Sequence, residues 1–318
     1  MSGWLEKLNI LFQFDEPTSR LYHVNILSSL ALILGLALYL QIKNPKNLKI
    51  LLKKWLFDKR YWWNSSTKQD YFIYIFNGLL KSLLLVPLLD ISFEISRFTV
   101  RSLMSMTPGG DTLDLPTSSL YIGIFSLAVF VWDDFLRFIH HYLMHKIPLL
   151  WEFHKTHHNA RVLTPITLFR AHPIESVIAV LRNSLSLGVA SGIFVYTFGS
   201  TMTVWTILGV NGIGFIFNLV GANLRHSHIP LGFGIFENII ISPIQHQIHH
   251  SRKTEHYDKN FGVTLAIWDK LFGTHVYSKN IGPLKVGINE PFKKSNYRLL
   301  VDPVRAAYQH FKLQRPGT

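Results

Sequence analysis

The chain has 318 residues, 48% of them hydrophobic and only 16% charged, which excludes an ordinary soluble domain and indicates a membrane protein. The formal net charge of +13 favours an anionic membrane surface over nucleic acid as the partner, because the lysines and arginines flank long apolar runs. The absence of cysteine excludes disulfides, iron–sulfur clusters, thiolate metal sites and a cysteine nucleophile, so nitrogen and oxygen must hold any metal.

The first apolar run extends from Val24 to Ile42 and contains no charged residue. Its 19 residues come close to the ~20 that a helix needs to cross the hydrocarbon core, so the sequence predicts the first membrane span here. The 23 residues before it mix acidic and basic side chains with apolar ones and show no secretory signal. We therefore expect this span to be retained.

Two further spans are predicted at Tyr71–Leu89 and at Ser118–Ile139. Lys81 lies in the middle of the second span and would cost roughly 2.5 to 3.5 kcal/mol on an insertion scale unless it is paired, so a re-entrant segment is the alternative. The third span ends in charged residues that should face water or a polar cavity. These residues are Asp133, Asp134 and Arg137.

The segment from Asn183 to Leu224 contains no charged residue. At ~1.5 Å per residue a single helix of this length would be about twice as long as the bilayer core is thick. The sequence therefore predicts two spans that turn near Gly199, Ser200 and Thr201. Two uses of the last span stay open, since its glycines permit close helix packing and its aromatic residues could line a lipid path. These are Gly209, Gly212, Gly214 and Gly221, and Trp205, Phe215 and Phe217.

The loop between the first two spans carries eight basic residues against two acidic ones, Asp58 and Asp70. By the positive-inside rule this loop is cytoplasmic and the N-terminus lies outside. With this orientation, the segment after the third span and the segment from Ser227 onward also lie on the cytoplasmic side. The predicted fold class is an all-α polytopic membrane helical bundle with about four to five spans, in a bacterial inner membrane or an endoplasmic reticulum membrane.

Eight of the sixteen histidines fall into three clusters with the spacings HxxxH, HxxHH and HxxHH. Residues three and four apart share a helix face, so each cluster would direct imidazoles toward one point, and eight ligands suffice for two metal ions. Without a cation such clustering would be unfavourable, because protonated histidines repel one another. The clusters are His141 and His145; His154, His157 and His158; and His246, His249 and His250.

The ligand type does not select the metal, because imidazole suits zinc, copper, iron and nickel alike. Two metals beside a membrane, with many histidines and no carboxylate base in the clusters, favour oxygen activation over hydrolysis. Isolated histidines are more often ordinary surface or core residues. That interpretation applies to His23, His256, His275 and His310.

From Asp134 to about His275 the sequence resembles the fatty acid hydroxylase and sterol desaturase superfamily of membrane di-iron enzymes. The first block matches in Asp134, Phe135, Phe138, His141 and His145. In this alignment His140 is a bystander, and Tyr142 stands where relatives commonly have arginine.

The other blocks match the same superfamily closely. Residues 151–158 are similar to its W-x-x-H-x-x-H-H pattern, and residues 242–250 to its S/T-P-x-x-H-x-x-H-H pattern. Residues 260–262 and 268–274 are similar to the closing signature N-[YF]-G followed by W-D-x-[LI]-F-G-T.

The resemblance implies that the eight cluster histidines are the catalytic metal ligands and hold two iron ions in a cytoplasmic cap. With dioxygen as co-substrate, these would hydroxylate or desaturate a lipid taken from the bilayer. No flavin, nicotinamide or haem-binding fingerprint is evident, so a separate electron-donor protein or reductase is expected. Relatives carry further histidines, some of them ligands, at positions that correspond to His172, His226 and His228. These three are candidates for ligands or for residues that hydrogen-bond to ligands.

The expected organisation has three parts. Residues 1–117 form a membrane segment with two spans and a basic cytoplasmic loop, 118–275 a fatty acid hydroxylase-like catalytic domain, and 276–318 a basic cytoplasmic tail. Two other functions are the alternatives. A membrane zinc hydrolase would need fewer histidines and a carboxylate base, and no HExxH is present. A metal transporter or sensor should have its histidines within the spans.

Overall fold

The computed structural model describes residues 21–43, 48–199, 215–279, 281, 284–292 and 295–313, with the backbone alone at 81–89, 311 and 313. Within these residues the fold is helical, with two isolated β-bridges and no strand, which confirms the predicted all-α class. The α-helices are α2 His23–Lys43, α3 Leu48–Phe57, α4 Lys59–Trp62, α5 Ser65–Ser105, α6 Ser119–Lys146, α7 Pro148–His158, α8 Pro173–Phe198, α10 Pro243–His249, α11 Ile267–Leu271 and α12 Asn296–Leu313. Short 3-10 helices lie at Pro165–Phe169, Ala222–Leu224, Gly234–Asn238 and Thr254–His256.

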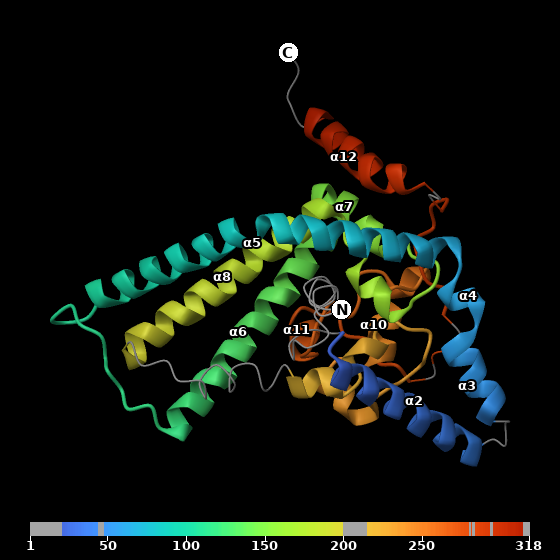
Figure 1. The fold of residues 1–318 in the computed structure, drawn as a ribbon, viewed down its shortest axis with the longest axis horizontal. Helices are drawn as coiled ribbons and strands as arrows, with labels where there is room; N and C mark the ends of the chain where they lie inside the picture. The colour runs from blue at the N-terminus through green and yellow to red at the C-terminus, as the bar shows by residue number, and fades with distance from the viewer. Residues whose placement is uncertain are drawn as a thin grey trace, which may run out of the picture.

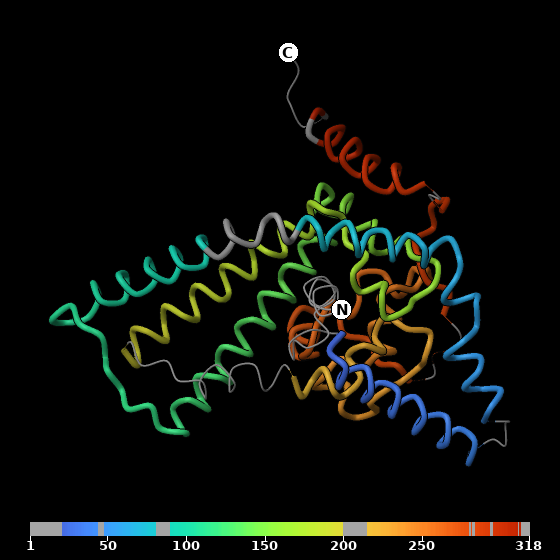
Figure 2. The backbone as a smooth tube through the Cα atoms, in the orientation of Figure 1, coloured from blue at the N-terminus to red at the C-terminus, as the bar shows by residue number. Residues whose placement is uncertain are grey.

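Three long helices, α5, α6 and α8, form an elongated arm on one side of the molecule (Figure 1). The start of α5, the end of α6 and the start of α8 come to the same end of this arm, as the tube in Figure 2 shows. The short helices α7, α10 and α11 and the loops between them gather at that end. The C-terminal helix α12 packs on α7. The arm therefore carries a loop-rich unit in which all three histidine clusters lie.

Two glycines of α8 allow it to pack closely against α5. Gly188 and Gly192 are four residues apart and therefore lie on one face of the helix. A Cβ at Gly188 would lie 2.7 Å from the carbonyl oxygen of Ser92, and a Cβ at Gly192 would lie 2.5 Å from Cβ of Thr99. Small residues at this spacing let two helix backbones approach closely, as they do in membrane proteins.

Within the described residues, two helices have the length and the apolar composition to cross a membrane, α2 and α8. The helix α2 coincides with the predicted first span. The helix α8 begins at Pro173, ten residues before the predicted start of the fourth span, and ends at Phe198. Gly199 follows with φ of 71°, so the predicted turn begins at a residue that favours this left-handed backbone.

The second and third predicted spans differ from the helices that contain them. Tyr71–Leu89 is the middle of α5, whose 41 residues extend it to Ser105. Ser118–Ile139 forms most of α6, which continues to Lys146. The hydropathy pattern marks apolar stretches, whereas helices end where capping groups and turns end them. Most of the predicted fifth span, with Trp205, Gly209, Gly212 and Gly214, lies outside the described residues, so the number of spans stays a prediction.

The close packing of α5 and α8 can be tested with Gly192→Val. We expect the variant to lower the free energy of unfolding by about 1 to 3 kcal/mol, because the added side chain overpacks the contact with Thr99. Thermal unfolding of the protein in detergent measures this effect. Gly123→Val on α6 is the control, since a Cβ there meets no atom within 4 Å. Equal melting of the two variants would contradict the assigned packing.

Candidate metal centre

Nine histidines come together at the loop-rich end in two groups, within each of which the candidate ligand atoms all lie within 4.8 Å of one another. We call the groups site A and site B. Site A consists of His141, His145, His154, His158 and His249, and site B of His157, His226, His246 and His250. The two sites are neighbours, because the rings of His158 in site A and His250 in site B stack with centroids 4.4 Å apart.

The helical spacing of each HxxHH block divides its histidines between the two sites. On α7, His154 and His158 are four apart and share site A, while His157 points to site B. At α10 the assignment is reversed, because His246 and His250 share site B and His249 belongs to site A. Each block thus contributes to both sites, which keeps the two sites adjacent.

The inner ring nitrogens face one another at distances that suit a shared cation. The Nε2 atoms of His145 and His158 are 3.1 Å apart, and the Nε2 atom of His226 is 3.1 Å from that of His157 and 2.9 Å from that of His246. Two nitrogens bound at right angles to a metal at ~2.1 Å would be about 3 Å apart.

The outer ring nitrogens are held by acceptors that determine the tautomer. Nδ1 of His141 donates to the carbonyl oxygen of Phe261 at 2.8 Å, and Nδ1 of His249 donates to that of Lys259 at 2.7 Å. Nδ1 of His154 donates to Oε1 of Glu175 at 2.8 Å. Because a carbonyl oxygen only accepts, these rings carry their proton on Nδ1 and present the Nε2 lone pair inward.

Buried nitrogens without a protein partner provide the test of whether the sites suit a metal. Nε2 of His154, Nε2 of His249 and both ring nitrogens of His250 are buried and make no hydrogen bond. Unsatisfied buried polar atoms are costly, and a metal ion would satisfy these inner nitrogens. The nine imidazoles therefore fit metal ligation.

Burial also keeps the imidazoles neutral, as ligation requires. It lowers the pKa of His157 and of His249 to about 3, with a further contribution from the neighbouring His154. Burial likewise holds the pKa of His158 and His250 well below the ordinary histidine value, and repulsion from the surrounding histidines adds to this.

The buried carboxylates of Asp134 and Asp269 hold the loop at 260–274, which supports site A, through hydrogen bonds. Asp134 accepts hydrogen bonds from the backbone of Thr264 and Leu265 and from Nε1 of Trp268 at 2.9 to 3.0 Å. The prediction that Asp134 faces water or a polar cavity is therefore wrong, because the loop at 260–274 covers it. Asp133, in contrast, is half-buried, and its carboxylate pairs with Arg137.

Asp269 acts from within the same loop. Its carboxylate accepts from the backbone of Phe261 at 2.8 Å and of Gly262 at 2.7 Å, and from Oγ1 of Thr274 at 2.6 Å. A Cβ at Gly262 would lie 2.7 Å from the Asp269 carboxylate, which explains the glycine. The closing sequence signature thus places the Phe261 carbonyl that holds His141.

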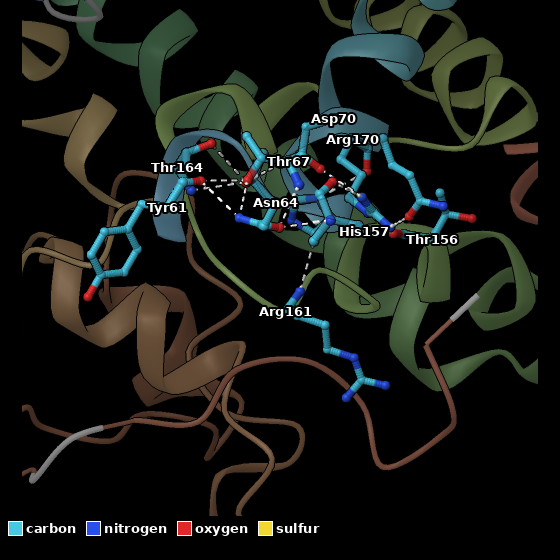
Figure 3. A network of polar contacts seen from close by, with 12 residues as sticks. Tyr61, Asn64, Thr67, Asp70, Thr156, His157, Arg161, Thr164 and Arg170 are labelled. Carbon is cyan, nitrogen blue, oxygen red and sulfur yellow. Dashed lines mark hydrogen bonds and ion pairs between the residues drawn. The ribbon is translucent and has the colours of Figure 1, made fainter. Parts of the chain in front are cut away.

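A buried ion pair anchors site B to α5 (Figure 3). Arg170 and Asp70 have side chains with no exposed surface, and Nη1 of Arg170 lies 2.7 Å from Oδ1 of Asp70. The same guanidinium donates to the carbonyl oxygen of Thr156 at 2.7 Å and to Oε1 of Gln69 at 2.9 Å. The carbonyl oxygen of Arg170 accepts from Nδ1 of His157 at 3.2 Å. Asp70 therefore supports a histidine of site B from another helix.

The structure separates the three additional candidate histidines. His226 lies in site B. His172 lies in neither group, because its Nδ1 accepts from the backbone of Ile174 and caps α8, while its Nε2 donates to the carbonyl oxygen of Leu300. His228 also lies outside both groups, and its ring stacks on Tyr61 with centroids 3.5 Å apart.

Sequence reasoning missed several residues that hold the histidines. In the region of His172 it singled out that histidine, whereas the side chain of Glu175 and the carbonyl of Arg170 make the contacts with cluster histidines. It also did not assign a role to Arg225, which is buried with Nη2 3.2 Å from Nδ1 of His246. Asp70 is 100 positions from Arg170, and no local spacing links the two.

Comparison with known proteins gives a family for this region. Residues 126–274 match the family model described as fatty acid hydroxylase. The chain is 24% identical over 183 residues to alkylglycerol monooxygenase of Homo sapiens, covering 58% of this chain and 36% of the relative. It is 26% identical over 170 residues to ornithine lipid hydroxylase OlsE of Rhizobium tropici, covering 54% and 47%, respectively. The chain thus spans less than half the length of these curated relatives. No solved structure is similar enough to count as a match.

The supporting role of Asp70 can be tested with Asp70→Asn. Removing one partner of a buried ion pair leaves an unpaired charge, so we expect a loss of about 3 to 5 kcal/mol in the free energy of unfolding. We also expect the affinity of the protein for metal to fall about 10- to 100-fold, as with other losses of support for ligands. Thermal unfolding and metal retention during dialysis against a chelator measure the two effects.

Asp58→Asn is the matched control for this variant. Asp58 pairs with Arg60 near the surface, where an ion pair contributes little to stability. If Asp70→Asn has the same free energy of unfolding and the same metal retention as Asp58→Asn, Asp70 does not support site B.

Proposed function

We propose that this chain, whose residues 126–274 match the fatty acid hydroxylase family model, is a membrane di-iron enzyme that uses dioxygen to hydroxylate or desaturate a lipid. The observation that carries the proposal is the convergence of nine imidazoles into two adjacent groups. The names of the relatives, a monooxygenase and a lipid hydroxylase, support the same class of reaction.

The number of nitrogen donors favours iron over zinc. Structural zinc is almost always bound by four ligands and catalytic zinc by three protein ligands, whereas site A alone offers five imidazoles. Imidazole is a suitable ligand for iron. When bound, the two iron ions would supply the activation of dioxygen at a C–H bond of the lipid.

Residues of the chain would bind the metal ions, orient the histidine rings and exclude water from the sites. The inner nitrogens would bind the metal, and Glu175 together with the carbonyls of Lys259, Phe261 and Arg170 orients four of the rings. Phe261 has no exposed surface, and its ring contacts those of His141 and His249, so it covers site A with an apolar group. A buried apolar surround excludes water, which would otherwise compete for the metal.

The reaction requires electrons from outside the lipid. Hydroxylation inserts one oxygen atom into a C–H bond and reduces the other to water, which consumes two electrons and two protons. Desaturation removes two hydrogen atoms and reduces both oxygen atoms to water, which also requires two further electrons and two protons. We propose that a separate electron-donor protein or reductase supplies them.

We propose that the enzyme is a multi-pass membrane protein with sites A and B on the cytoplasmic side. The apolar helices α2 and α8 support membrane insertion. So does α6, whose apolar residues Leu120, Ile124 and Leu127 are more than half exposed. The basic loop that follows α2 supports the orientation.

A zinc hydrolase is less well supported than this enzyme. The two carboxylates that contact site A already have partners. Glu175 accepts from His154, and Asp258, whose Oδ1 lies 3.5 Å from Nδ1 of His145, pairs with Lys146 at 2.6 Å. A hydrolase needs a free carboxylate to act as a base on metal-bound water.

Metal analysis together with Mössbauer spectroscopy of anaerobically purified protein tests the proposal. We expect about two iron ions per chain with a coupled spectrum, because sites A and B are adjacent. Zinc alone would instead support a hydrolase, and mixed, loosely exchanging metals would support a transporter or sensor.

A second prediction concerns individual ligands. We expect His157→Ala and His249→Ala each to abolish lipid oxidation and to reduce bound iron, while insertion into the membrane stays normal because the apolar helices are separate from the sites. Activity, iron content and membrane fractionation measure these effects. His310→Ala on α12, where the side chain is 42% exposed and pairs with Glu152, serves as the control. Normal turnover in either site variant would exclude the ligand assignment.

A further inference from the structure

A cavity of about 750 Å³ lies next to site B and takes no part in holding the histidines. Its wall includes Ser227 and His228, which directly follow His226 of site B. Gln247 of α10, the residue after His246, forms part of the same wall. Opposite parts of the wall come from α3, from α4 and from the segments 161–163 and 284–286.

The wall of this cavity is positively charged. Among the residues that the structure describes, four basic residues and no acidic one line it. Arg161 donates to the backbone carbonyls of Ile288 and Glu290, and Arg252 donates to that of Val286, so neither of these contacts cancels the positive charge. The basic residues are Lys54, Arg161, Arg252 and Lys285.

Two acidic residues close in sequence to the cavity wall, Asp58 and Glu290, form ion pairs with other residues. Asp58, which precedes α4, forms a two-pronged contact with Arg60 at 2.6 to 2.9 Å. The carboxylate of Glu290 lies 3.3 Å from Nζ of Lys155. The ring of His228 stacks as a flat surface on Tyr61, with centroids 3.5 Å apart. The lining of the cavity thus carries net positive charge.

Part of the cavity wall is apolar, and it adjoins α2, one of the two helices that could cross a membrane. Trp55 and Leu163 line it, together with Ile244 of α10. Trp55 is buried in a cluster with Ile33 and Ala37 of α2. The outer face of α2 exposes apolar side chains that would contact acyl chains in a bilayer. These are Leu27, Leu30, Leu34 and Leu38, which are 42 to 61% exposed.

We propose that this cavity binds the phosphate headgroup of an anionic lipid and so positions the lipid beside site B. Guanidinium and ammonium groups recognise phosphate through charge-assisted hydrogen bonds, and the apolar wall accepts the carbons that follow the headgroup. The proposal rests on the proposed function for what happens to the lipid. It adds the chemical class of the substrate, a lipid that carries a phosphate.

Figure 3 shows how the cavity is connected to the support of site B. The side chains of Tyr61 and Arg161 extend away from the network of Asp70, Arg170 and His157, on one side of it. The backbone of Tyr61 accepts from Thr67, and the backbone of Arg161 donates to Ser66, so α5 positions both parts of the cavity wall. A lipid bound in the cavity would lie close to site B, and α5 supports both the cavity wall and His157 of site B.

Two charge-matched double variants test the proposal. Lys54→Gln with Lys285→Gln removes two positive charges from the cavity wall, while Lys53→Gln with Lys279→Gln removes two from outside it. All four lysines are exposed, so we expect both variants to fold and to melt like the unaltered protein. The full-length protein purified in detergent is used throughout.

The measurement is competitive binding of dioleoyl phosphatidic acid and dioleoyl phosphatidylcholine, followed by native mass spectrometry. We expect the unaltered protein and the Lys53, Lys279 variant to prefer phosphatidic acid. We expect the Lys54, Lys285 variant to bind it at least about tenfold more weakly, since it has lost two charged partners. An equal loss in both variants, or no preference in the unaltered protein, would overturn the proposal.

Two further arms identify the source of the phosphate and separate this inference from the proposed function. Inorganic phosphate at the lipid concentration should not displace phosphatidic acid, and displacement would show a site for free phosphate and overturn the lipid assignment. Iron content is measured on the same samples. Protein that binds phosphatidic acid without iron would refute the di-iron function alone, and iron-loaded protein without lipid preference would refute the lipid site alone.

Discussion

The structure depends on the cost of burying many imidazoles whose inner nitrogens face one another. The Nε2 atoms of His154 and His249 and both ring nitrogens of His250 make no hydrogen bond with the protein, and burial lowers the pKa of His249 and His250 so that these rings are neutral. Lone pairs that converge in this way repel one another unless a cation lies between them. Much of the surrounding fold holds these rings in that arrangement. A bound metal would remove the repulsion between the nitrogen lone pairs.

Support for the rings comes from outside the histidine blocks and from distant parts of the chain. Asp134 in the middle of α6 and Asp269 in α11 shape one loop, and that loop offers carbonyls to His141 and His249. Arg170 offers its carbonyl to His157 and is itself anchored to Asp70 on α5. Asp70, Asp134 and Asp269 thus act as structural acceptors.

The long helices and the loop-rich unit have complementary roles in the proposed enzyme. The helices α2 and α8 are apolar enough to lie in a bilayer, and α5 joins the arm to the histidine end. The basic cavity lies between α3 and site B, and its wall shares Trp55 with the apolar cluster on α2. A lipid that enters from the membrane would meet positive charge for its headgroup near the proposed iron sites.

The sequence by itself determined the helical class, the apolar helix α2, the end of an apolar helix at Gly199 and the spacing of the eight cluster histidines. These features are local, since a helix repeats every 3.6 residues and an apolar run can be read from neighbouring positions. Only the tertiary structure decided that each HxxHH block divides its rings between two sites, and that His226 joins them while His172 and His228 do not. It also decided the pairing of Asp70 with Arg170 and of Asp134 with Trp268, because contacts across a hundred or more positions depend on how helices pack.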